Sequence, residues 1–197
     1  MCKIAVIILA AGASTRLGQP KQLLPYKGKT LIRHAAETAH DGGYEPVIVV
    51  TGALHEQLLA ELKEEHIEVI HNSNWQQGMS ASIRTGVEAA EKQEPDAVLI
   101  MLCDQPLITS EHLKALGITF SSLEDGSIVA TGYEHIAGVP ALFPRKLFNS
   151  LKELQGEQGA RELLKVHQNS LVTVSFAGAA VDIDTPEDLS GFMDRSS

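Results

Sequence analysis

Near the N-terminus, the apolar run Ile4-Ala5-Val6-Ile7-Ile8-Leu9 leads directly into Ala10-Ala11-Gly12-Ala13-Ser14-Thr15-Arg16-Leu17-Gly18, a stretch of small and polar residues. The run is rich in β-branched side chains, a pattern typical of a strand that is buried on both faces. Such strands belong to parallel sheets that carry helices on each face, and these sheets bind ligands beyond the carboxyl ends of their strands. The stretch therefore predicts a parallel α/β fold with a ligand-binding loop after its first strand.

Further apolar runs alternate with helical patterns along the chain, which predicts a three-layer α/β/α fold with a mainly parallel, Rossmann-like sheet. The expected strands are 4–9, 47–50, 67–70, 97–102, 127–131, 139–143 and 171–176. The expected helices begin after the capping residues Thr30, Ser80 and Thr109, and also cover 54–64, 146–154, 160–166 and a short segment from Pro186. A turn near Gly138 is expected to join the fifth and sixth strands. No linker interrupts the pattern, so residues 1–194 are expected to form one domain and residues 195–197 a flexible tail.

Charge is distributed unevenly. The 197 residues contain 16 Lys and Arg against 25 Asp and Glu, a net charge of −9, which makes the chain a poor ligand for a nucleic-acid polymer or an anionic membrane. Residues 1–36 nevertheless have a net charge of +6, because they contain no Asp or Glu. The cations of this segment are Lys3, Arg16, Lys21, Lys27, Lys29 and Arg33. The segment predicts a local site for a small anion.

The cysteine content and the apolar N-terminal run bear on location. The chain has two cysteines, Cys2 and Cys103, and these form neither a disulfide framework nor a Cys-x-x-Cys metal motif. Cys103 ends an apolar run and is expected to be a core residue. Residues 4–11 are too few to cross a bilayer, and no signal-peptide cleavage pattern follows them. We therefore expect a cytoplasmic protein that is not bound to a membrane.

Charged groups stand beyond two of the expected strands. Arg16 and Lys21 lie within and after the small-residue loop, where cations and backbone N–H groups can hold phosphate oxygens. Asp104 follows the strand 97–102, and a carboxylate in this position suits Mg²⁺, which prefers hard oxygen ligands. The residues alone leave structural alternatives open. The loop could be a flexible turn with two solvated cations, and Asp104 could cap a turn or helix before Pro106.

Several segments, in the same order along the chain, resemble motifs of the MobA-like nucleotidyltransferases. They are Leu9-Ala10-Ala11-Gly12-x-Ser14-x-Arg16-x-Gly18-x-x-Lys21, Gly78-Met79-Ser80-x-Ser82, Asp104-Gln105-Pro106, Gly138-x-Pro140-x-Leu142-Phe143 and Asp182-Ile183-Asp184-Thr185-Pro186-Glu187-Asp188-Leu189. Gly156-Glu157-Gln158-Gly159-Ala160-Arg161 is similar to a further motif, with Glu157 in place of Asp. The Ala-Ala-Gly form of the first motif resembles the molybdenum cofactor cytidylyltransferase branch. The resemblance covers nearly the whole chain and implies a sheet of the nucleotide-diphospho-sugar transferase type.

The resemblance also implies roles for single residues. Those implied to bind the nucleotide are Leu9, Ala10, Ala11, Gly12, Ser14, Arg16, Lys21, Gly78, Met79, Ser80 and Ser82. Arg16, Lys21 and Asp104 would be catalytic. Asp104 and Asp184 would hold Mg²⁺, with Asp182 a poorer ligand. The residues implied to bind the acceptor are Gly138, Pro140, Gly159 and Arg161, although Val139 stands where many relatives carry His.

The resemblance predicts that the chain transfers CMP from CTP to the terminal phosphate of molybdopterin and releases pyrophosphate. CTP, a molybdopterin-type acceptor and a molybdoenzyme of the xanthine dehydrogenase type are the expected partners. One alternative is a nucleotidyltransferase that uses GTP or another acceptor, such as a sugar phosphate. Another is a non-catalytic carrier that delivers the cofactor to an apo-enzyme. The presence of Arg16, Lys21, Asp104 and Asp184 together argues against the carrier.

Overall fold

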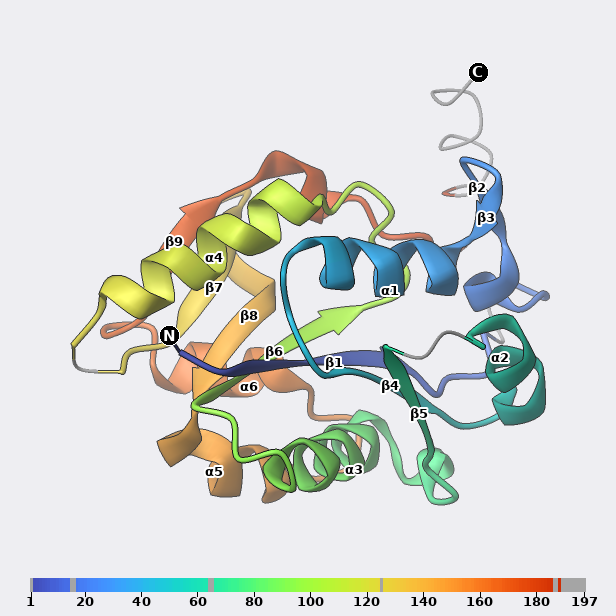
Figure 1. Ribbon diagram of the computed structural model, residues 1–197, viewed down its shortest axis with the longest axis horizontal. Helices are drawn as coiled ribbons and strands as arrows, with labels where there is room; N and C mark the ends of the chain where they lie inside the picture. Colours follow the sequence, from blue (N-terminus) through green and yellow to red (C-terminus); the bar gives the residue numbers. More distant parts are fainter. Residues whose placement is uncertain (1, 15–16, 64–65, 125, 186–187, 189–197) are drawn as a thin grey trace.

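We describe residues 2–14, 17–63, 66–124, 126–185 and 188 of the protein in a computed structural model. Their centre is a seven-stranded sheet with the strand order β5-β4-β1-β6-β8-β7-β9 (Figure 1). The strands are β1 (Ile4–Ala10), β4 (Val47–Thr51), β5 (Ile67–His71), β6 (Ala97–Leu102), β7 (Val129–Tyr133), β8 (Ile136–Pro144) and β9 (Val172–Ser175). β8 runs antiparallel to both of its neighbours, and the other pairings in the sheet are parallel.

Helices cover both faces of the sheet (Figure 1). One face carries α1 (Leu31–Asp41) and α4 (Ser110–Ser122), and the other carries α3 (Met79–Glu91), α5 (Phe148–Lys152) and α6 (Ala160–Val166). A short helix, α2 (His55–Glu61), follows β4, and a small hairpin of β2 (Pro25–Tyr26) and β3 (Lys29–Thr30) precedes α1. The predicted three-layer α/β/α fold with a mainly parallel sheet is therefore confirmed. In the described part of the chain, no helix is both long and apolar enough to cross a membrane.

The double burial of β1 explains its sequence. Ile4, Val6 and Ile8 enter one core, which is shared with α1 and α4, whereas Ile7 and Leu9 enter a second core, which is shared with α3 and α6. Alternate residues of a strand point to opposite faces, so a central strand between two helical layers needs apolar residues at every position. All seven residues of β1 are buried.

Two of the three predicted helix caps are confirmed. The side chain of Thr30 accepts a hydrogen bond from the backbone N–H of Arg33, and that of Thr109 accepts one from the backbone N–H of His112. The prediction for Ser80 was wrong, because α3 begins at Met79 and its capping residue is Gly78. Gly78 has a φ of 101°, a conformation that side-chain-bearing residues rarely adopt, so glycine favours a helix start at this position.

The predicted turn near Gly138 was also wrong. β8 begins at Ile136, so Gly138 lies within the strand and pairs with Thr131 of β7. The turn is formed by Glu134 and His135, whose φ angles are 47° and 65°. A two-residue hairpin turn with two positive φ angles is usually formed by Asn and Gly, and the absence of that signal explains the misplaced turn.

Other predicted bounds shift by a few residues. The helix expected at 54–64 is α2, His55–Glu61, and the one expected at 146–154 is a 3₁₀ turn at Arg145–Leu147 followed by α5. The short helix expected from Pro186 and the tail 195–197 lie outside the described residues. The single domain 1–194 remains a prediction.

Candidate functional site

Three of the predicted site residues meet at the carboxyl edge of the parallel strands. Asp104 follows β6, Lys21 follows the loop after β1, and Asp184 comes from the C-terminal part of the chain. The ammonium Nζ of Lys21 lies 2.8 Å from Oδ1 of Asp184 and also forms an ion pair with Oδ2 of Asp104. The backbone N–H of Ile183 donates to the carbonyl of Asp104 at 3.1 Å, which fixes the 182–184 segment beside this carboxylate. The structure thus brings together residues that are far apart in sequence.

The charges of this cluster perturb one another. Burial disfavours the charged form of Lys21, but the negative charge of Asp104 and the hydrogen bonds that Lys21 donates to Asp104 and Asp184 outweigh burial and raise the pKa of Lys21. Partial desolvation and the negative charge of Asp104 raise the pKa of the nearby Asp182 to about 6. Lys21 is therefore charged at neutral pH, and it offsets part of the negative charge of the carboxylates.

The donor set of the cluster fits a hard cation. Oδ1 of Asp104 is buried and has no hydrogen-bond partner among the described residues, while Oδ2 of the same carboxylate faces Lys21. Within the described residues, no group of three or more His, Cys, Asp and Glu side chains is arranged to hold a metal ion. Asp104 and Asp184 nevertheless supply two carboxylates at one point, which is the number that Mg²⁺ commonly uses alongside water and the phosphates of a substrate.

The loop after β1 is organised by Gln22, which the sequence analysis missed. The side chain of Gln22 is 1% exposed. Its Nε2 donates to the carbonyls of Ala10 at 3.2 Å and Gly12 at 2.7 Å, and its Oε1 accepts from the hydroxyl of Ser14 at 3.1 Å. The same hydroxyl accepts from the backbone N–H of Lys21 at 3.2 Å. Gln22 therefore fixes the loop conformation and the start of the segment that carries Lys21.

The other predicted nucleotide-binding residues of this loop lie on either side of the groups that Gln22 contacts. Leu9 and Ala10 end β1, Ala11 is buried, and Ser14 has a φ of 53°. No local sequence signal identifies Gln22, because its partners are mostly backbone carbonyls of the preceding loop. Arg16, which was predicted to be catalytic, lies outside the described residues.

The second predicted nucleotide loop contacts the loop that was assigned to the acceptor. The backbone N–H of Ser80 donates to the carbonyl of Gly156 at 3.1 Å, and a side-chain carbon at Gly78 would lie 2.3 Å from the same carbonyl oxygen. A side-chain carbon at Gly159 would lie 2.6 Å from Sδ of Met79. The two loops therefore form one continuous wall, and glycine is needed at position 78, where their backbones meet.

Asn72 stabilises this wall from within and was also missed. Its Nδ2 donates to the hydroxyl of Ser82 at 3.0 Å, and its Oδ1 accepts from the backbone N–H of Asn74 at 3.0 Å. Both Asn72 and Ser82 are buried. Ser82 thus acts on the loop conformation through Asn72 in this structure. A polar residue directly after a strand was a signal that could have identified Asn72.

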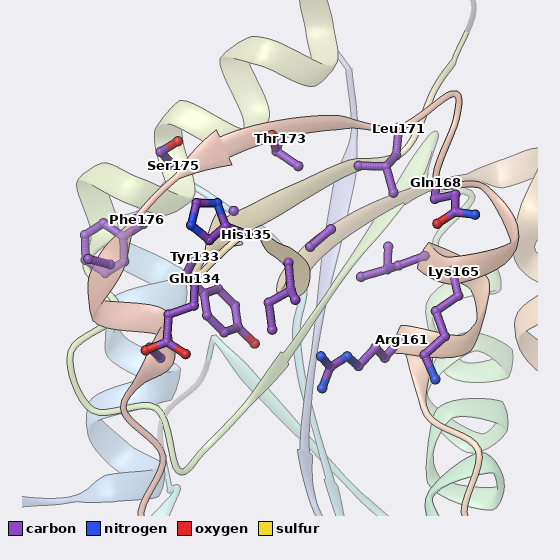
Figure 2. Close-up of a pocket in the computed structure, with 16 residues that line it drawn as sticks. Tyr133, Glu134, His135, Arg161, Lys165, Gln168, Leu171, Thr173, Ser175 and Phe176 are labelled. Carbon is purple, nitrogen blue, oxygen red and sulfur yellow. The ribbon is translucent and has the colours of Figure 1, made fainter.

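The predicted acceptor residues of β8 are internal to the sheet. Gly138 lies under the ring of Tyr133, since a side-chain carbon at Gly138 would come within 2.4 Å of the Tyr133 hydroxyl oxygen. Pro140 is buried, and its carbonyl accepts a hydrogen bond from Oγ1 of Thr131 at 2.7 Å. Arg161, in contrast, lies on α6 and lines a cavity of about 920 Å³ between α6 and the strands β7, β8 and β9 (Figure 2).

Cys103 lies in the core, as predicted, and Lys27 and Lys29 make local contacts near the β2–β3 hairpin. Cys103 is 4% exposed, and burial raises the pKa of its thiol to about 12, so it is an inert core residue. Lys27 lies 5.0 Å from the centre of the Tyr26 ring, and Lys29 forms an ion pair with Glu37.

Comparison with known proteins gives consistent matches. Residues 6–172 match the family described as MobA-like NTP transferase domain. The chain is 32% identical to nicotine blue oxidoreductase of Paenarthrobacter nicotinovorans over 93% of each protein. It is 28% identical to the molybdenum cofactor cytidylyltransferase of Escherichia coli over 95% of this chain and 94% of that protein.

A solved structure shares the whole fold. Rv0371c from Mycobacterium tuberculosis H37Rv superposes with a TM-score of 0.85 at 26% identity, and the match covers 98% of both chains. A complex of Rv0371c with manganese superposes with a TM-score of 0.82 at 25% identity, again over 98% of both chains.

Proposed function

Because the chain belongs to the family of MobA-like NTP transferase domains and is therefore a nucleotidyltransferase, we propose that it transfers CMP from CTP to the terminal phosphate of molybdopterin. The observation that carries the proposal is the placement of Lys21 between Asp104 and Asp184, beside the loop after β1. The E. coli relative named molybdenum cofactor cytidylyltransferase supports this choice of donor and acceptor.

The proposed reaction is an in-line displacement at phosphorus. An oxygen of the acceptor phosphate forms a bond to the α-phosphorus of CTP, and the bond from that phosphorus to the bridging oxygen of the β-phosphate breaks. Pyrophosphate leaves with the electron pair of the broken bond. Since the attacking phosphate is already an anion, the reaction needs no strong general base. Catalysis then rests on positioning and on neutralising charge.

Each residue of the cluster has a task in this scheme. Asp104 and Asp184 would hold Mg²⁺, which when bound supplies positive charge to the phosphate oxygens. The manganese complex of Rv0371c supports a divalent cation in this fold. Lys21 adds a second positive charge at the same point, and Gln22 holds the loop on which the triphosphate would lie. Arg16 is proposed to contact the triphosphate as well.

Pyrophosphate release tests the proposal directly. We expect the purified protein to release pyrophosphate when it receives CTP, molybdopterin and Mg²⁺ together, and not when any one of the three is omitted. The same assay with GTP, or with a sugar phosphate as acceptor, separates the alternative nucleotidyltransferases. Binding of molybdopterin and CTP without pyrophosphate release would contradict the proposal and favour a carrier.

The Asp104→Asn variant tests the metal assignment. We expect it to reduce pyrophosphate release by at least about a hundredfold, because a neutral amide is a poor Mg²⁺ ligand and no longer pairs with Lys21. Asp41→Asn, at the exposed end of α1, is the matched control and should retain full activity. Near-normal release by the Asp104→Asn variant would show that Asp104 is not a metal ligand.

The two cysteines bear on the cellular location of the proposed reaction. Cys2 and Cys103 are both free thiols, which fits the reducing cytoplasm that we propose as its location. The product would pass to a molybdoenzyme of the xanthine dehydrogenase type. Co-purification of labelled product with such an apo-enzyme would test this step.

A further inference from the structure

Gln105 is a buried polar residue to which the proposed reaction gives no role. It follows Asp104 directly and is 5% exposed. Its Nε2 donates to the backbone carbonyl of Ala179 at 3.1 Å. Because this carbonyl can only accept, the nitrogen of the amide must face it, and Oε1 is directed elsewhere. Oε1 is buried and has no hydrogen-bond partner among the described residues.

The stability of the fold does not by itself favour glutamine at this position. A buried acceptor without a partner destabilises a folded protein, and methionine, which has about the same length, would bring no such acceptor. Buried polar atoms without a partner are uncommon in native proteins. The amide of Gln105 is explained instead by the two segments that it joins, the loop after β6 and the 3₁₀ turn Ala177–Ala180.

This turn leads into the segment that carries Asp184. Ala179 is fully buried, and Ile183 is 1% exposed. The backbone N–H of Ile183 donates to the carbonyl of Asp104 at 3.1 Å. The segment is therefore attached to the loop after β6 at two points, at position 179 by the side chain of Gln105 and at position 183 by the backbone of Asp104. Asp184 comes directly after the second of these points.

The two attachments set the position of one carboxylate relative to the other. Lys21 contacts both Asp104 and Asp184, at 2.8 Å in the case of Asp184, so the two carboxylates lie on either side of one small group. The side chain of Asp184 is 37% exposed, and its position follows largely from the backbone that carries it. A displacement of this backbone by about 1 Å would already impair a site in which both carboxylates must contact one cation.

We propose, on the basis of the proposed function, that Gln105 is a positioning residue for the divalent cation. Its amide holds the 179–184 segment on the loop after β6 and thereby keeps the carboxylate of Asp184 at the distance from Asp104 that one cation requires. Gln105 itself contacts neither the cation nor the nucleotide. Its replacement should therefore weaken the binding of nucleotide together with metal and leave metal-free nucleotide binding intact.

Calorimetric titration of CTP with and without Mg²⁺, in the absence of an acceptor, tests this role. With Mg²⁺ we expect Gln105→Met to weaken CTP binding about tenfold, because the donor to Ala179 is lost and Asp184 is no longer held in place. In EDTA the affinities of the variant and the unmodified protein should agree within about twofold. Gln93→Met, at an exposed site after α3, is the matched control and should bind CTP like the unmodified protein.

A shorter amide at the same position gives a second, milder variant. Gln105→Asn keeps the polar group but places it one methylene short of the Ala179 carbonyl, and we expect it to weaken Mg²⁺-dependent CTP binding about threefold. This variant carries the test if Gln105→Met does not fold. Unchanged CTP binding with Mg²⁺ in Gln105→Met, or in Gln105→Asn where that variant takes its place, would overturn the assignment.

A double-mutant cycle with Asp184→Asn shows whether Gln105 acts through Asp184. In the Asp184→Asn background, Gln105→Met should change Mg²⁺-dependent CTP binding by less than about twofold, because the carboxylate that Gln105 positions is gone. A general structural role would give the same loss in both backgrounds, and in EDTA as well. That result would also overturn the assignment.

The assignment and the proposed function can fail separately. If the CTP titrations give the expected losses but CTP and molybdopterin release no pyrophosphate, the proposed function fails and the positioning role stands. If pyrophosphate is released and the unmodified and Gln105→Met proteins need the same Mg²⁺ concentration for it, the proposed function stands and the positioning role fails. Absence of Mg²⁺-dependent CTP binding to the unmodified protein would refute both.

Discussion

The ammonium of Lys21 is shared by two carboxylates that are 83 and 163 residues away in the sequence. Two carboxylates and one ammonium leave a net negative charge at this point, and a divalent cation would make it positive. A triphosphate is strongly anionic, so the charge balance of the cluster favours the metal and the nucleotide together rather than either one alone.

Replacing Lys21 should weaken the binding of the nucleotide. We expect Lys21→Met to weaken CTP binding by about 1.5–3 kcal/mol, because a charge-assisted contact is lost. Lys27→Met, a control in the hairpin turn, should change the binding free energy by only about a few tenths of a kcal/mol, as is usual for an exposed charge. Calorimetric titration of CTP in the presence of Mg²⁺ measures both values. Equal losses in the two variants would mean that a diffuse field, rather than Lys21, attracts the nucleotide.

Replacing Gln22 should destabilise the loop after β1. In Gln22→Leu, the carbonyls of Ala10 and Gly12 would lose their donor, and a buried unpaired polar group costs about 1–3 kcal/mol. We expect the free energy of unfolding, measured in urea, to fall by about that amount, and CTP affinity to fall with it. Gln93→Leu, at an exposed site after α3, is the control. A stable variant with normal CTP affinity would show that the loop does not depend on Gln22.

At the scale of the elements, the central strands and their burial on both faces were predictable, because their side chains alternate between two apolar cores. Nearly every position of β1 and β6 must be apolar, so an apolar run in the sequence identifies each of these strands. The β7–β8 hairpin was harder to predict, because its turn consists of Glu134 and His135, which do not usually adopt positive φ angles. The pairing of β7 with β8 holds this turn in place, so no local sequence motif predicts it.

The hairpin turn should therefore be open to stabilisation. Each residue with a side chain costs about 1–2 kcal/mol in the left-handed conformation, whereas Asn and Gly adopt it readily. We expect the double substitution Glu134→Asn and His135→Gly to raise the free energy of unfolding by about 1–2 kcal/mol, measured by chemical denaturation. The matched pair Glu134→Ala and His135→Ala keeps the conformational demand and should give no increase. A gain in the alanine pair as large as in the first pair would refute the explanation by strain.

At the scale of the whole molecule, the sequence predicted which charged residues stand at the carboxyl edge of the sheet, but not how they pair. Asp104 and Lys21 could be assigned to that edge from their positions after strands. The pairing of Lys21 with both carboxylates depends on the path of the chain near Asp184, and this path is set by packing of segments far apart in sequence. Gln22 and Asn72 were missed for the same reason, because their roles consist of contacts made only after folding.

A buried chain of hydrogen bonds joins one helical layer to the sheet. Nε2 of His112 on α4 lies 2.9 Å from Oγ1 of Thr131 on β7, and this hydroxyl donates to the carbonyl of Pro140 on β8. Since the hydroxyl proton is used on Pro140, Nε2 of His112 must be the donor to Thr131. Burial lowers the pKa of His112 to about 4, so the ring is neutral in the folded protein at neutral pH.

This histidine should make the stability of the whole protein sensitive to acid. A group whose pKa falls on folding stabilises the protein fully above its unfolded pKa, which is about 6.5 for His, and this contribution is lost as pH falls toward 4. Asp182 acts in the opposite direction: its raised pKa of about 6 means that its contribution is lost as pH rises. The net pH dependence of the unmodified protein should therefore be shallow between pH 4 and pH 6, and a comparison with a variant is needed to isolate His112.

The His112→Gln variant separates the two effects. Glutamine can still donate a hydrogen bond to Thr131 but cannot be protonated. We expect the unmodified protein to lose about 2 kcal/mol more stability than His112→Gln between pH 7.5 and pH 5, because protonation of His112 favours the unfolded chain. Urea denaturation of both proteins at the two pH values measures this difference. Parallel losses in the two proteins would mean that His112 does not titrate in this range and does not cause the acid sensitivity of the fold.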